Sequence, residues 1–359
     1  MEDMVNPWRG RRVFLSGHTG FKGGWLSLWL ASMGASIRGY ALAPESSPDL
    51  FTAACVGSVL DDVRGDIRSY PDIETAMTEF QPEVVFHLAA QPLVRRSYAD
   101  PLGTYAANVM GTANILEAAR KTQSVRAVVC VTTDKCYQNQ EWIWPYRETD
   151  ALGGFDPYSS SKACAEIVCS AYRTSFLDVG DETGHRVALA TARAGNVIGG
   201  GDWSEDRLIP DLIRGFHSTQ PALIRRPKAI RPWQHVLEPL HGYILLAEKL
   251  LTGQPRFASA FNFGPDDGDA WPVEQIATRL VNLWGDGASW ISDESPSVHE
   301  AHSLRLDSSR ARVELGWNPK LSIESALDWT VSWYRIWHAG GDLLQATRDQ
   351  IAAYERLLR

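Results

Sequence analysis

A tyrosine and a lysine four residues apart are the side chains of this sequence best suited to chemistry. Tyr158 and Lys162 stand in the segment Tyr-Ser-Ser-Ser-Lys, and that spacing places them on one face of a helix. A nearby cation lowers the pKa of a tyrosine below its ordinary value of about 10, which makes the phenolate available as a base near neutral pH. The pair alone is weak evidence, because Tyr-x-x-x-Lys occurs by chance in many helices.

Three further polar residues, Thr133, Asp134 and Lys135, close a run of residues that predicts a buried strand at 125–133. Ligands bind beyond the carboxyl ends of parallel strands, so the Thr133 hydroxyl can face the same pocket as Tyr158. Asp134 and Lys135 would place an acid and a base beside it. Without this context, the two charges would be interpreted as a solvated pair in a loop.

A glycine-rich turn supplies a third component. Its sequence, Gly-His-Thr-Gly-Phe-Lys-Gly, follows a predicted strand at 12–16 and opens a predicted helix at 21–33. Glycines in this position allow a tight turn and let backbone N–H groups approach a pyrophosphate at the positive end of a helix. With this loop, Lys162 can also hold the ribose of a nicotinamide cofactor. The predicted cofactor-binding residues of the turn are Gly17, Thr19, Gly20, Phe21, Lys22 and Gly23.

The residues alone leave NAD and NADP both open. A carboxylate at the end of the second strand usually binds the adenosine ribose. Here the first acid beyond that strand is Glu45, and Arg38 within the strand could favour a 2′-phosphate.

The elements that position these groups follow from hydrophobic periodicity. Strands and helices alternate, which predicts βαβ units and an α/β fold with a doubly wound parallel sheet covered on both faces. The expected strands are 12–16, 37–42, 83–90, 125–133 and 186–194, and the expected helices are 21–33, 73–80, 104–121 and 158–176.

The alternation weakens from about residue 199. We therefore expect residues 1–198 to form the nucleotide-binding domain with the catalytic residues, and 199–359 a smaller mixed α/β lobe, with a soft boundary that the chain can cross. Helices are expected at 208–216 and 239–251, a strand at 261–263, and a C-terminal helix containing Trp329, Trp333 and Trp337.

Composition limits the partners. Among 359 residues, 43 Asp and Glu exceed 35 Lys and Arg, and there is no basic block, so nucleic acid is not an expected partner. The chain has no apolar run of about 18 residues and no basic-then-apolar start, so neither a membrane span nor a secretory signal is expected. Five cysteines without a Cys-x-x-Cys pair indicate reduced thiols and the cytoplasm. No metal is expected, since His299 and His302 have no nearby cysteine.

Taken together, these motifs resemble the extended short-chain dehydrogenases/reductases that act on nucleotide sugars, and most closely the CDP-glucose 4,6-dehydratases. The resemblance covers nearly the whole chain. It implies a Rossmann-type fold with a smaller C-terminal substrate lobe, NAD as cofactor, and a cytoplasmic homodimer or homotetramer. The implied reaction converts CDP-glucose to CDP-4-dehydro-6-deoxyglucose for the deoxysugars of surface polysaccharides such as the O-antigen of lipopolysaccharide. The matching segments are 17–23, 89–98, 133–137, 195–203 and 231–240.

The resemblance also implies roles for individual residues. Tyr158 would remove the proton of the sugar C4 hydroxyl, Thr133 would position that oxygen, Asp134 would protonate the departing C6 hydroxyl, and Lys135 would remove the C5 proton. Related dTDP-type enzymes have a glutamate where Lys135 stands, so a lysine base is a hypothesis that requires a lowered pKa. Further implied cofactor contacts are Asp66, Ile67, Leu88, Ala89, Ala90, Gln91 and Asn108. The implied substrate contacts are His87, Arg96, Asn196, Arg207, Arg231 and Trp233.

Two other functions remain open at this point. A nucleotide-sugar 4-epimerase would use the same cofactor and the same Tyr/Lys pair, but it needs no acid–base pair such as Asp134 and Lys135. A non-catalytic NAD-binding regulator would have no reason to keep Thr133, Tyr158 and Lys162 together. The same dehydration on another nucleotide hexose is also possible on residues alone, because the cytidine assignment rests on the resemblance.

Overall fold

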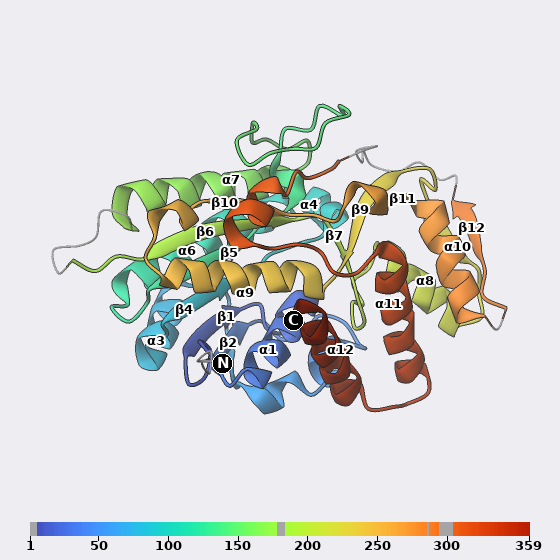
Figure 1. The fold of residues 1–359 in the computed structure, drawn as a ribbon, viewed down its shortest axis with the longest axis horizontal. Coiled ribbons are helices and arrows are strands. Elements are labelled where there is room, and N and C mark those ends of the chain that lie inside the picture. Colours follow the sequence, from blue (N-terminus) through green and yellow to red (C-terminus); the bar gives the residue numbers. More distant parts are fainter. Residues whose placement is uncertain (1–5, 178–183, 286, 294–303) are drawn as a thin grey trace.

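A seven-stranded sheet forms the centre of the molecule (Figure 1). The computed structural model describes residues 6–177, 184–285, 287–293 and 304–359, and the strand order is β10-β6-β5-β4-β1-β2-β3. All neighbouring strands are parallel, which confirms the prediction of a doubly wound sheet. The strands are β1 (Arg12–Ser16), β2 (Ser36–Ala41), β3 (Asp61–Arg64), β4 (Val84–His87), β5 (Ala127–Val131), β6 (Ala188–Ala194) and β10 (Ala260–Phe263).

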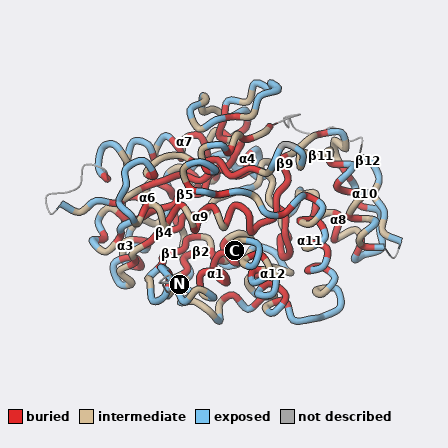
Figure 2. The backbone as a smooth tube through the Cα atoms, viewed as in Figure 1, coloured by how far each residue is buried: buried red, intermediate tan, exposed pale blue. Residues whose placement is uncertain are grey.

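Helices cover both faces of the sheet, because successive side chains of a strand point to opposite sides. Phe14 of β1 packs in one apolar cluster with side chains of α3 and α6, whereas its neighbours Val13 and Leu15 pack in another with side chains of α1 and α9. Figure 2 shows the central strands as largely buried backbone between these layers, and α9 as a largely buried helix. The first layer contains α3 (Tyr70–Phe80), α6 (Gly111–Lys121) and α7 (Pro157–Tyr172), and the second α1 (Phe21–Ser32), α9 (Leu237–Leu251) and α12 (Leu343–Leu358).

The described residues of the smaller lobe form two short sheets and three longer helices. One sheet has the order β11-β9-β7 and the other pairs β12 with β8. After residue 198 the chain also returns to the large sheet, because α9 covers β5 and β6 and β10 pairs with β6. The elements of the lobe are β7 (Asn196–Ile198), β8 (Ala222–Arg225), β9 (Ile230–His235), β11 (Ala270–Pro272), β12 (Trp290–Asp293), α8 (Leu208–His217), α10 (Val273–Trp284) and α11 (Ile323–His338).

Short helices complete the chain. The helix expected at 104–121 is divided: α5 (Pro101–Tyr105) leads through a π-helical turn, Ala106–Met110, into α6. A 3₁₀ helix, Asp134–Cys136, follows β5, and a second π-helical turn, Arg173–Leu177, follows α7. The remaining short helices include α2 (Leu50–Ala53) and α4 (Val94–Ala99).

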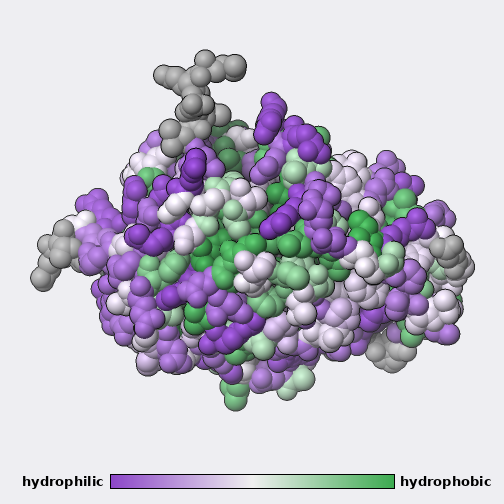
Figure 3. Space-filling view, turned by 90° about the horizontal axis from the view of Figure 1, so that it is seen from below, coloured by the Kyte–Doolittle hydropathy of each residue, from purple (hydrophilic) through white to green (hydrophobic). Residues whose placement is uncertain are grey.

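The surface is mixed in polarity. From below, apolar side chains gather in a central band that hydrophilic side chains border (Figure 3). Within the described ranges, no helix combines the length and the apolar character needed to cross a membrane.

Candidate active site

The glycine turn is packed so closely that side chains cannot replace its outer glycines. Gly17 has a φ of +84°, and a Cβ there would lie 2.7 Å from the backbone nitrogen of Ala89. A Cβ on Gly23 would collide with the carbonyl oxygen of Gly17. The turn ends at Gly20, the N-cap of α1, and no described side chain caps that helix end. Its first N–H groups therefore remain suited to an anion, and the cradle fits the pyrophosphate of a dinucleotide.

Three further residues expected to bind the cofactor, Thr19 of the glycine turn and Asp66 and Ile67, lie near the ends of β2 and β3. Thr19 donates a 3.0 Å hydrogen bond to the carbonyl of Leu42. Asp66 pairs with Arg68 at 2.5 Å, and hydrogen bonds from Arg68 hold the pKa of the Asp66 carboxyl below its ordinary value. Ile67 is buried, and its side chain packs against Gly111 of α6. A Cβ added to Gly111 would lie 2.6 Å from Cδ1 of Ile67.

Sequence reasoning missed a buried histidine in the same turn. His18 bonds Asp62 of β3 at 2.8 Å, and its ring fills the space that a side chain on Gly39 of β2 would need. Burial lowers the pKa of His18, opposed by Asp62. The sequence could have indicated it, because His18 stands between Gly17 and Gly20 in a turn that packs closely on the sheet.

The segment after β4 connects the glycine turn to α7, the helix that bears Tyr158 and Lys162. Ala89 donates its N–H to the hydroxyl of Ser16 at 3.3 Å, and Leu88 and Ala90 are half-buried on either side. Gln91 donates its N–H to Asn108 Oδ1 at 2.8 Å, while Asn108 Nδ2 donates to the Gln91 carbonyl at 3.0 Å. The same amide donates to Ser161 of α7 at 2.9 Å. Asn108 therefore holds the β4 loop against α7.

The five predicted catalytic residues come from two elements. Thr133 caps the 3₁₀ helix that contains Asp134 and Lys135, while Tyr158 and Lys162 lie on the first turns of α7. The Thr133 hydroxyl donates to Asp134 Oδ1 at 2.9 Å and lies close enough to the Tyr158 phenol to affect its pKa. Lys162 Nζ donates to the carbonyl of Val131 at 3.3 Å. The structure thus places a phenol, a hydroxyl and a carboxyl close together in space.

Burial dominates the electrostatics of this cluster. It raises the pKa of Tyr158 to about 12, with the Thr133 hydrogen bond acting in the opposite direction. Our expectation that the neighbouring lysine lowers the tyrosine pKa is therefore wrong for this state, because desolvation of the phenolate is the larger effect. Burial also lowers the pKa of Lys162 and raises that of Asp134. A raised carboxyl pKa favours the protonated form, which is the form that can donate a proton.

Further charges surround Asp134. Lys22, expected to bind cofactor, lies close enough to interact with Asp134 and Lys162, and burial followed by the charge of Arg207 lowers its pKa to about 8. Arg207 in turn donates to Asp202 Oδ2 at 2.8 Å. Asp202, which is buried, was not predicted as a site residue, although it belongs to the Gly-Gly-Gly-Asp-Trp segment that follows the last strand of the first domain.

Of the expected substrate residues, Asn196 and Arg231 also approach this cluster. Asn196 begins β7 directly after Gly195, where a Cβ would lie 3.0 Å from Asp134 Oδ2. The positive charge of Arg231 acts on Asp134 and opposes the rise in its pKa. With Arg207, they form the lobe side of the site.

The other three expected substrate residues already have partners within the protein, although the charge of Lys162 acts on His87, and Trp233 of β9 pairs with Asn196 of β7. His87 is 3% exposed and bonds Ser16 at 2.7 Å, and burial lowers its pKa to about 3, so it is a neutral core residue beneath the glycine turn. Trp233 is 5% exposed and donates to the Trp271 carbonyl at 3.1 Å, so its ring is packed rather than open to a base. Arg96 forms an exposed ion pair with Glu45.

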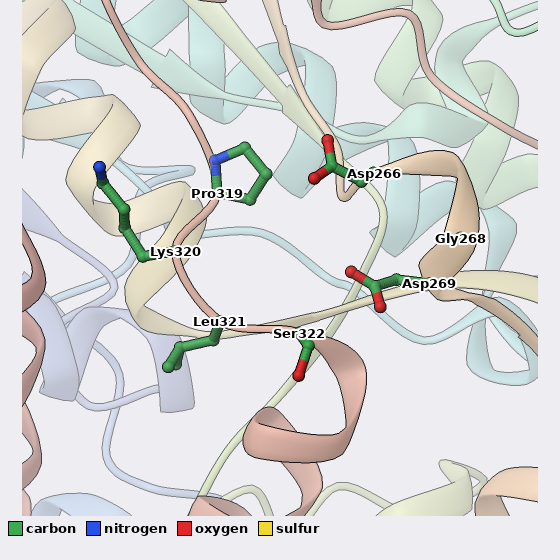
Figure 4. Close-up of a pocket in the computed structure, with 7 residues that line it drawn as sticks. All are labelled: Asp266, Gly268, Asp269, Pro319, Lys320, Leu321 and Ser322. Atoms are coloured by element: carbon green, nitrogen blue, oxygen red, sulfur yellow. The ribbon is translucent and has the colours of Figure 1, made fainter.

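No cluster of three or more metal-ligating side chains occurs among the described residues. His299 and His302 lie outside them. A pocket of about 290 Å³ lies in the lobe between the 266–269 turn and the segment before α11, and no predicted site residue lines it (Figure 4). Its lining residues are Asp266, Gly268, Asp269, Pro319, Lys320, Leu321 and Ser322.

Comparison with known proteins defines the class. Residues 13–264 match the model of the NAD-dependent epimerase/dehydratase family, and the chain belongs to that family. The match confirms the resemblance inferred from the motifs and agrees with NAD as the cofactor.

A CDP-glucose 4,6-dehydratase from Salmonella typhimurium is 51% identical over 349 residues, which cover 97% of each chain. Among solved structures, a UDP-glucose 4-epimerase from Thermotoga maritima has a TM-score of 0.78 at 20% identity, over 90% of this chain and 98% of that one. A dTDP-glucose 4,6-dehydratase from Bacillus anthracis in complex with NAD has a TM-score of 0.74 at 20% identity, over 93% and 100%. These two structures show the fold, and the Salmonella relative shows the family at high identity.

Proposed function

We propose that this chain catalyses the NAD-dependent dehydration of CDP-glucose to CDP-4-dehydro-6-deoxyglucose. The observation that carries the proposal is the contact of Asp134, a buried carboxyl with a raised pKa, with Thr133 beside Tyr158. Elimination of water needs an acid next to the site of oxidation, whereas an epimerase does not. The 51% identity to a CDP-glucose 4,6-dehydratase supports both the reaction and the nucleotide.

Each residue has one task in this proposal. Tyr158, once its own proton has left, accepts the proton of the C4 hydroxyl as C4 loses a hydride, and Thr133 holds the same oxygen; this step requires a Tyr158 pKa below the value of about 12 that burial gives it. The resulting ketone acidifies the C5 proton, which Lys135 removes, while Asp134 protonates the departing C6 hydroxyl so that water leaves. C6 then gains the hydride and C5 regains a proton. When bound, NAD supplies the acceptor that takes the hydride from C4 and returns it at C6.

The positive residues of the site match a diphosphate. Arg207 and Arg231 approach the cluster from the smaller lobe, and guanidinium groups bind phosphate oxygens in a fork. We assign them, with Asn196, to the nucleotide diphosphate. The glycine turn with the Leu88–Gln91 segment is assigned to NAD.

We further propose a homodimer or homotetramer in the cytoplasm that provides a deoxysugar precursor for surface polysaccharide such as lipopolysaccharide O-antigen. The helices α5 and α7 contact one another. They and the π-helical turns that follow them, Ala106–Met110 and Arg173–Leu177, expose apolar side chains, which suits a subunit interface. The five cysteines are free thiols, as the cytoplasm maintains. The exposed apolar residues are Leu102, Met110, Ile167 and Phe176. Light scattering of the wild type and of Ile167→Asp tests the interface.

The test of the reaction is incubation of the purified protein with CDP-glucose, with and without added NAD, followed by mass spectrometry. Loss of one water without net NADH is expected. Parallel incubations with dTDP-, GDP- and UDP-glucose test the nucleobase. A changed hexose configuration without loss of mass would instead establish a 4-epimerase, and no reaction with any nucleotide hexose would support a regulator.

A further inference from the structure

A buried ion pair lies directly behind the proposed catalytic side chains. Glu166 Oε2 and Arg193 Nη2 are 2.7 Å apart, with side chains only 3% and 4% exposed. Glu166 lies on α7 one turn after Lys162, and Arg193 lies on β6. Burial raises the pKa of Glu166, but Arg193 and two hydroxyl donors outweigh it, so the net pKa is below the ordinary value and the carboxylate is charged.

The carboxylate of this pair holds the residue that follows β5 and a residue in the middle of β6. Thr132 donates to Glu166 Oε1 at 2.5 Å, and Thr191 of β6 donates to Oε2 at 2.8 Å. Thr132 immediately precedes Thr133. The contact therefore fixes the backbone at the start of the Thr133–Lys135 segment to the helix that bears Tyr158.

The guanidinium holds the other end of the same segment. Arg193 Nη1 donates to the Tyr137 phenol oxygen at 2.8 Å and to the Glu148 carbonyl at 3.2 Å. Tyr137 follows the 3₁₀ helix Asp134–Cys136, and its hydroxyl donates to Asn262 Oδ1 at 2.7 Å. The segment with Thr133, Asp134 and Lys135 is thus attached to one ion pair on both sides, through Thr132 and Tyr137.

Stability alone is a weak explanation for such a pair. Removing two charges from water costs several kcal/mol each, and apolar replacements of buried pairs are often neutral or stabilising. We propose that Glu166 and Arg193 are positioning residues for the dehydration: together they set the distance between the Tyr158–Lys162 face of α7 and the Thr133–Lys135 segment. This inference rests on the proposed function.

The test compares the wild type with Glu166→Gln, which keeps the shape and removes the charge. With CDP-glucose we expect kcat to fall about 10- to 100-fold, the range that a displacement of about 1 Å produces, with KM and NAD affinity within about twofold. Thr132→Val, which removes one hydrogen bond and no charge, is expected to give a smaller loss of kcat with a near-native melting temperature. It keeps the test decisive if Glu166→Gln does not fold.

Glu238→Gln is the matched control. Glu238 is a second buried glutamate, on α9, whose carboxylate accepts hydrogen bonds from Tyr354, Lys320 and Leu321. It is expected to change the melting temperature and leave kcat per folded molecule unchanged. The inference is overturned if folded Glu166→Gln and Thr132→Val retain wild-type kcat, or if all three variants lose activity only in proportion to unfolding. Failure of the wild type to dehydrate CDP-glucose would instead overturn the proposed function.

Discussion

The Thr133 hydroxyl donates a 2.9 Å hydrogen bond to the Asp134 carboxylate, so the residues proposed to act at C4 and at C6 of the sugar are in direct contact. The same hydroxyl lies close enough to the Tyr158 phenol to lower its pKa, against the larger effect of burial. A substrate oxygen that enters this group must exchange with existing hydrogen bonds rather than with bulk water. The site is therefore arranged before substrate arrives, which is the condition under which fixed groups stabilise a transition state best.

Tyr158→Phe is expected to abolish the first step. The phenyl ring keeps the packing but cannot accept the proton of the C4 hydroxyl, so turnover should fall about 10²- to 10⁴-fold, the range for loss of a general base. Mass spectrometry of the CDP-glucose reaction measures this, and binding of CDP-glucose by calorimetry should change little. Wild-type turnover in the variant would remove Tyr158 from the mechanism.

Asp134→Asn should separate oxidation from elimination. The amide oxygen can still accept the hydrogen bond from Thr133, but the side chain can no longer supply a proton to the C6 hydroxyl. In a single turnover we expect absorbance of reduced nicotinamide to accumulate, which the wild type should not show. A variant without that absorbance and with full product yield would contradict the role of Asp134.

Lys135→Ala tests the C5 base. In deuterated water, the wild type is expected to place solvent deuterium at C5 of the product. The variant should lose most of that exchange, because it lacks the side chain proposed to remove the C5 proton. Equal rates of deuterium incorporation would exclude Lys135 and direct attention to Lys22, whose pKa is lowered to about 8 and which interacts with Asp134.

Gly23→Ala should destroy the cofactor cradle. The added Cβ would collide with the Gly17 carbonyl oxygen, so the turn must open and NAD affinity, measured by calorimetry, should fall by more than tenfold, about 1.4 kcal/mol or more. The control is Gly268→Ala, where no atom lies within 4 Å of the added Cβ. NAD affinity equal to that of the control would show that the turn does not hold the pyrophosphate.

Glu238 gives a pH dependence of stability. Burial raises its pKa from 4.5 to about 7, so the folded state binds more protons than the unfolded state between these values. The free energy of unfolding should therefore fall as pH rises from about 4.5 to about 7. In Glu238→Gln, which does not titrate, this part of the slope should disappear from denaturant unfolding curves. An unchanged slope would mean that Glu238 does not titrate in this range.

The large sheet was predictable where apolar runs are continuous. β1 has the predicted bounds, and β4, β5 and β6 lie within the predicted runs. β3 was not predicted, because its sequence Asp-Asp-Val-Arg is that of a charged edge strand. The place of β10 beside β6 follows from pairing between distant segments, for which the local sequence contains no signal.

The candidate site was likewise predictable from the sequence only in part. Motif order placed Thr133, Asp134, Tyr158 and Lys162 correctly on elements that meet, because strand ends and helix starts are local features. The substrate role of His87 stays a prediction; a strand end does not reveal which face its side chain takes, and this side chain is buried against Ser16 and Thr112. Asp202 and the Glu166–Arg193 pair were missed because buried polar contacts join residues far apart in sequence.

The position of β10 limits how the chain can be divided. A fragment ending at residue 198 would contain the glycine turn and every proposed catalytic residue, yet β6 would become an open sheet edge and α9 would no longer cover β5 and β6. Such a half-molecule would expose backbone donors and acceptors together with apolar surface, a combination that promotes aggregation. On the ribosome, the large sheet therefore cannot be completed until β10, and thus most of the chain, has been synthesised.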